Sequence, residues 1–128
     1  MQLLDIDLTH NRMHITLAET FDEPEAQALL SEVEARMEEL QEGFLVLCDL
    51  TSLQKFEPTA RLHFRRIMDL CNERGVGKVI RIASNPLNDF GLTVLSHFHY
   101  DSHVPVITCR TFEEAARHLC VDQSPDSA

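Results

Sequence analysis

Residues 44–64 read FLVLCDLTSLQKFEPTARLHF, and this stretch holds the change from strand to helix that decides the fold. Its first five residues, 44–48, are continuously apolar, which is typical of a strand covered on both faces and predicts a central parallel strand. Pro58 suits the first turn of a helix. Apolar residues then recur at helical spacing up to Arg74-Gly75, where glycine favours a helix end: Ala60, Phe64, Ile67 and Cys71.

The N-terminal part predicts a hairpin followed by a helix. Apolar residues alternate with polar ones over residues 4–8 and 13–17, on either side of a polar turn at His10-Asn11, which indicates an antiparallel hairpin with one buried face. Asp22 stands three residues before Glu25, with Pro24 between them, and this is a capping-box-like helix start. We expect the helix to end near Gly43, with these residues inside: Ala26, Leu29, Leu30, Val33, Met37 and Leu40.

The C-terminal part predicts two further strands and two further helices. Residues 78–83 (KVIRIA) form the first strand, and Asn88-Asp89 can cap a helix whose inner residues are Phe90, Val94, Leu95 and Phe98. Residues 104–109 form the last strand, which Pro105 places at a sheet edge because proline cannot donate to a ladder. Thr111 and Glu114 make a capping box for a short final helix that we expect to run through Leu119.

The predicted fold class is therefore α/β, with a mixed sheet of about five strands flanked by about four helices. The order is a hairpin, a helix and then three strand–helix pairs, so right-handed crossovers make the later strands parallel. Residues 3–120 should form a single domain, because 128 residues leave no room for a second one, and residues 121–128 should form a flexible C-terminal tail.

Composition excludes several partners and one kind of cross-link. The net charge of -10 opposes contact with nucleic acid, because that contact needs clustered Lys and Arg. We expect a cytoplasmic protein without membrane contact, since the start lacks a basic signal region and no apolar run is long enough to span a bilayer. The cysteines lie far apart without CxxC spacing, which indicates reduced core thiols: Cys48, Cys71, Cys109 and Cys120.

The element order and the stretch after the central strand resemble the STAS domain family, which includes bacterial anti-sigma factor antagonists. The family pattern is roughly D-L-S-x-[VL]-x-x-[FM]-D-S-[ST]-G. Thr59 falls where antagonists carry their phosphorylated Ser or Thr, and Glu57 stands where the family has Asp. Pro58 and Ala60 depart from the pattern, replacing a Ser and the Gly. The residues in register with the pattern are Asp49, Leu50, Thr51, Leu53 and Phe56.

The resemblance implies a regulatory protein-binding module without enzymatic activity or cofactor. Its partner would be an anti-sigma factor or a serine/threonine kinase, and phosphorylation at Thr59 would weaken the complex. The resemblance places the partner-binding surface on these residues: Asp49, Thr51, Ser52, Glu57, Pro58, Thr59 and Arg61.

The residues themselves also allow plainer roles for this stretch. Thr59 can simply satisfy backbone donors at a helix start. Asp49 ends the central strand and can orient the following loop by accepting its N–H groups, as in an Asx turn.

Two alternatives of other classes stay open. His97, His99 and His103 are the densest set of metal-capable side chains and could serve a metal-binding or small-ligand sensor, or an enzyme. A homodimer could instead form through the first hairpin or the Pro105 edge strand. The sequence contains neither a GxSxG nucleophile motif nor a phosphate-cradling Gly-rich loop.

Overall fold

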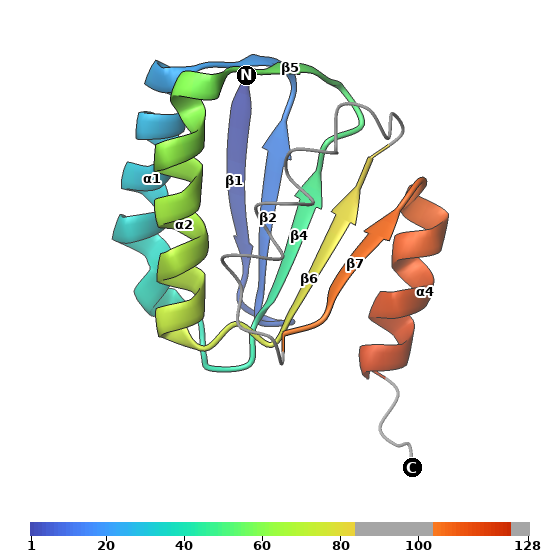
Figure 1. Cartoon of the computed structure of the whole chain (residues 1–128). Helices are drawn as coiled ribbons and strands as arrows, with labels where there is room; N and C mark the ends of the chain where they lie inside the picture. Colours follow the sequence, from blue (N-terminus) through green and yellow to red (C-terminus); the bar gives the residue numbers. More distant parts are fainter. Residues whose placement is uncertain (84–103, 124–128) are drawn as a thin grey trace.

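The computed structural model describes residues 1–83 and 104–123 and shows a five-stranded mixed sheet with helices on its two faces (Figure 1). The strand order is β1-β2-β4-β6-β7, with β1 and β2 antiparallel and all later neighbours parallel. The strands and α-helices are β1 (Gln2–Asp7), β2 (Arg12–Leu17), β3 (Glu19–Phe21), α1 (Glu23–Arg36), β4 (Leu45–Asp49), β5 (Leu53–Phe56), α2 (Arg61–Arg74), β6 (Lys78–Ile82), β7 (Val106–Cys109) and α4 (Phe112–Gln123).

The central strand β4 is buried on both faces, as its continuous apolar sequence predicts. Val46 and Cys48 belong to the core cluster formed with α1 and α2, which lie next to each other in Figure 1. Leu45 and Leu47 face the other way, into a smaller cluster that includes Ala115 of α4. The mixed sheet, the hairpin and the parallel central strand are therefore confirmed.

The predicted capping interactions are present at both ends of the chain. The Asp22 carboxylate accepts a hydrogen bond from the Glu25 N–H at 3.1 Å. The Thr111 hydroxyl accepts one from the Glu114 N–H at 3.2 Å. Gly75 ends α2 in the left-handed conformation with φ of 93°, which glycine adopts without strain.

Three predictions about element ends were wrong. Leu8 is 62% exposed because β1 ends at Asp7 and Leu8 enters the hairpin turn. The first helix stops at Arg36, and a 3₁₀ turn over Met37–Glu39 follows it. Beyond this turn, the Arg74 guanidinium donates to the Leu40 carbonyl oxygen at 2.8 Å. The final helix continues past Leu119 to Gln123.

Three further points concern the edge of the sheet, the helix expected near residues 88–98, and Arg81. The β7 strand lies at an edge of the sheet, as Pro105 suggested. The helix expected near residues 88–98 falls outside the described residues. Arg81, counted from sequence within an apolar strand, is only 4% exposed and donates a hydrogen bond to the Thr108 hydroxyl at 2.6 Å.

The backbones of Gly43 and Gly77 approach each other at the amino ends of β4 and β6. The Gly77 N–H donates to the Phe44 carbonyl oxygen at 2.8 Å. A Cβ atom added at Gly77 would lie 2.7 Å from the Gly43 carbonyl oxygen, and that atom belongs to a backbone that cannot rotate away. The absence of a side chain at Gly77 therefore lets β6 start next to β4.

Gly77→Ala should lower the free energy of unfolding by about 1–3 kcal/mol, because the new methyl group forces the two strand starts apart. Urea unfolding followed by circular dichroism measures this change. Ser31→Ala on the exposed face of α1 is the control and should leave the midpoint nearly unchanged. Equal midpoints for Gly77→Ala and wild type would show that the strand starts tolerate the added atom.

Candidate functional site

The candidate site is the segment between β4 and α2, residues 49–61, which we call the β4–α2 segment. It leaves the carboxyl end of the central parallel strand, where open α/β sheets bring their loops together. All the sequence-predicted partner-binding residues lie in it. The structure shows how this segment is held and which of its side chains face solvent.

Asp49 fixes the start of the segment. Its carboxylate accepts hydrogen bonds from the Thr51 N–H at 3.0 Å and from the Thr51 hydroxyl at 2.8 Å. This is the Asx-type turn that the sequence suggested for Asp49. The Leu50 N–H donates to the Ile82 carbonyl oxygen at 2.8 Å, so the turn is also joined to β6.

The middle of the segment is a strand that the sequence analysis did not predict. β5 pairs in parallel with β3 and forms a separate two-stranded sheet at the top of the view in Figure 1. The Glu19 N–H donates to the Ser52 carbonyl oxygen at 2.9 Å, and the Glu57 N–H donates to the Phe21 carbonyl oxygen at 3.0 Å. Backbone pairing therefore holds the segment at both ends of β5.

Three aromatic rings pack beneath the pairing of β3 with β5. The ring centroids of Phe21 and Phe56 lie 5.1 Å apart, and those of Phe56 and Phe64 lie 5.6 Å apart with edge-to-face geometry. Phe21 and Phe64 are also edge to face at 6.1 Å. Such pairs add favourable energy beyond their buried area, so this cluster joins β3, β5 and α2.

Thr59 lies on a 3₁₀ turn over Pro58–Ala60, and α2 begins only at Arg61. The expectation that Thr59 occupies the first turn of the α-helix was therefore wrong, because the chain turns more tightly before the helix starts. The side chain of Thr59 is exposed, and its hydroxyl makes no hydrogen bond to any residue that the structure describes. Thr59 caps neither the turn nor the helix, so the plainer role considered for it is not observed.

The neighbours of Thr59 divide into anchors and exposed side chains. Ala60 is fully buried, so the methyl group that replaces the family's glycine points into the core. Pro58 and Arg61 are exposed, and Leu62 is 70% exposed, which the sequence analysis did not single out. Lys55 and Glu57 form an ion pair at 3.4 Å. The outer surface therefore combines an apolar side chain with nearby charges.

The buried cysteines offer no reactive thiol. Cys48, Cys71 and Cys109 are free and buried, as expected for reduced core thiols. Burial raises the pKa of Cys71 to about 12, and the neighbouring Cys48 adds to this effect. Burial also raises the pKa of Cys109. Because the thiolate is the nucleophile, the raised pKa makes Cys71 and Cys109 poorly reactive at neutral pH.

His97, His99 and His103 lie outside the described residues. Within residues 1–83 and 104–123, no group of three metal-capable side chains comes together. In the same part of the chain, no helix has the length and apolar character needed to cross a membrane.

Comparison with known proteins shows the fold. No family model matches the sequence, and no curated protein matches it. A crystal structure of an uncharacterised DUF3478-family protein with a SpoIIAA-like fold, from Shewanella loihica PV-4, is 12% identical, with a TM-score of 0.70 over 93% of this chain and 94% of that one. The anti-sigma factor antagonist SpoIIAA in its unphosphorylated form is 14% identical, with a TM-score of 0.63 over 93% and 97%. The chain therefore has a SpoIIAA-like fold, as its STAS resemblance predicted.

Asp49→Ala should lower the free energy of unfolding by about 1–3 kcal/mol, because it removes the acceptor of two hydrogen bonds and leaves the Thr51 N–H without its partner. Asp49→Asn is the matched control, since its amide oxygen can still accept both bonds. Chemical unfolding measures both changes. Equal losses for Ala and Asn would mean that the negative charge, and not the turn, accounts for the role of Asp49.

Proposed function

We propose that the chain is a non-enzymatic regulatory module of the cytoplasm that binds a protein partner through the β4–α2 segment. The observation that carries this proposal is the exposed Thr59 hydroxyl, which has no hydrogen-bond partner among the described residues although the backbone around it is firmly held. A rigid backbone with an unengaged hydroxyl suits recognition, because binding then requires little ordering of the loop.

The partner that fits the fold likeness is an anti-sigma factor with serine/threonine kinase activity. A solved structure with the same fold is that of an anti-sigma factor antagonist, and its description names an unphosphorylated form. In this chain Thr59 is the residue in register with the family's modified position. Phosphorylation would add close to two negative charges and considerable bulk at the centre of the surface.

The two departures from the family pattern are compatible with this role. Ala60 points into the core, so its methyl group does not stand between the backbone and a partner. Pro58 fixes the backbone just before Thr59 and removes an N–H that the turn does not use. Leu62 adds an exposed apolar contact of the kind that interfaces bury.

Modification should be selective within the segment. Thr51 provides the internal comparison, because its hydroxyl donates to the Asp49 carboxylate. A kinase must break that bond before it can transfer phosphate to Thr51, whereas Thr59 needs no such step. Incubation with an anti-sigma-type kinase and ATP, followed by peptide mapping, should place the phosphate on Thr59. Phosphate found only on Thr51 or Ser52 would contradict the proposal.

Partner release is tested with substituted forms of the whole chain. Thr59→Glu should weaken binding to the kinase by at least about tenfold, because it adds a charge to the interface. Thr59→Val, which keeps the shape and removes the hydroxyl, should keep binding and lose phosphorylation. Ser31→Glu on α1 controls for added charge away from the segment. Equal affinities for wild type and Thr59→Glu, measured by calorimetry, would remove Thr59 from the interface.

A further inference from the structure

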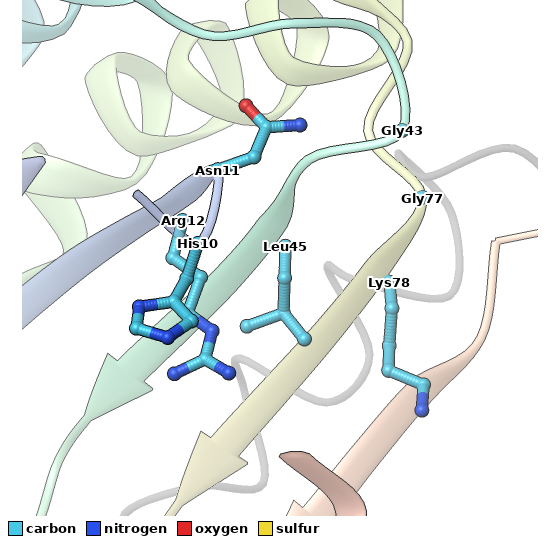
Figure 2. A pocket seen from close by; sticks show the side chains of 7 residues that line it. All are labelled: His10, Asn11, Arg12, Gly43, Leu45, Gly77 and Lys78. Atoms are coloured by element: carbon cyan, nitrogen blue, oxygen red, sulfur yellow. The ribbon is translucent and has the colours of Figure 1, made fainter. Parts of the chain in front are cut away.

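A pocket of about 370 Å³ lies at the end of the sheet opposite the β4–α2 segment (Figure 2). It lies where β2, β4 and β6 begin, next to the hairpin turn between β1 and β2. At the rise of a strand, Leu45 and Asp49 are separated by about 13 Å along β4, so the two places are distinct. The pocket is lined by His10, Asn11, Arg12, Gly43, Leu45, Gly77 and Lys78.

Two cationic residues flank an apolar floor. Arg12 pairs with Leu45 across β2 and β4, and Leu45 pairs with Lys78 across β4 and β6. Residues at paired positions of neighbouring strands point to the same face, so the three side chains form a row across the sheet. Figure 2 shows the Arg12 and Lys78 side chains on either side of Leu45.

Arg12 is partly buried. Its guanidinium makes no hydrogen bond or ion pair with residues 1–83 or 104–123. Asp7, which pairs with Arg12 across β1 and β2, accepts hydrogen bonds from the His10 ring at 2.8 Å and from the His10 N–H at 3.2 Å. The bond to His10 is the main cause that lowers the pKa of Asp7, and Arg12 contributes a smaller share.

Three other lining residues, Asn11, Gly43 and Gly77, are held by hydrogen bonds. The Gly43 N–H donates to the Gly75 carbonyl oxygen at 2.7 Å, and the Gly77 N–H is taken by Phe44. The Asn11 side chain exchanges two hydrogen bonds with the Gln41 backbone, at 2.8 and 3.0 Å. These groups shape the pocket, and its lining also includes the two cationic side chains of Arg12 and Lys78.

We propose that this pocket binds a small organic anion that carries phosphate or carboxylate groups. Its anionic groups contact Arg12 and Lys78, and its body lies on Leu45. Arginine presents a planar fork of N–H donors that matches both oxyanions. In a chain with a net charge of -10, a pocket whose lining, among the described residues, includes Arg12 and Lys78 and no carboxylate residue is a local exception to the overall charge.

Binding is measured by isothermal titration calorimetry on the full chain at low salt, with pyrophosphate and citrate as the two probes. We expect at least one of them to bind, and the tighter one to identify phosphate or carboxylate as the preferred group. Arg12→Gln and Lys78→Gln should each weaken binding by about tenfold or more. Raising the salt concentration should weaken it further, because ionic screening reduces the attraction.

The controls distinguish binding of the probe in the pocket from its general attraction to any surface cation. Arg65→Gln removes an exposed arginine of α2, outside both the pocket and the β4–α2 segment, and should bind the probe as wild type does. Thermal unfolding checks that each variant is folded, and Lys78→Gln remains informative if Arg12→Gln is unstable. The proposal is overturned if neither probe binds at millimolar concentration, or if Arg65→Gln weakens binding as much as the two pocket variants do.

Discussion

The backbone of β4 lies between two apolar layers, where each N–H and C=O group must find a partner inside the protein. β2 and β6 supply these partners on either side, and both run parallel to β4. Parallel neighbours require crossovers, and α1 and α2 provide them along one face of the sheet. β4 begins at Leu45 and ends at Asp49. The pocket and the β4–α2 segment lie at these two positions.

Much of the fold follows from local sequence. The apolar run 44–48, the alternation in the hairpin and the cap at Asp22 each specify one structure, because each satisfies backbone groups or buries a face without help from distant residues. The Asx turn of Asp49 belongs to the same class. Its donor lies two residues away, so the sequence contains all that is needed to predict it.

Other features depend on residues far apart in the chain. β3 and β5 are three and four residues long, and each becomes a strand only because the other lies next to it. The place of Thr59 follows from this pairing, since it fixes where the chain can turn into α2. Arg12 and Lys78 lie on either side of Leu45 because of the pairing register of β2, β4 and β6. The sequence around each residue does not reveal this register. Conversely, the exposure of Leu8 reflects a turn that begins one residue earlier than the alternation suggested.

The alternation of anchors and exposed side chains in the β4–α2 segment has an evolutionary consequence. Leu50, Leu53 and Ala60 are buried and hold the segment, whereas Ser52, Gln54 and Thr59 face solvent. Substitutions at exposed positions away from caps and networks usually change stability little. After gene duplication, the outward residues can therefore diverge while the inward ones preserve the backbone. The same backbone can therefore acquire new binding specificities while the protein stays folded.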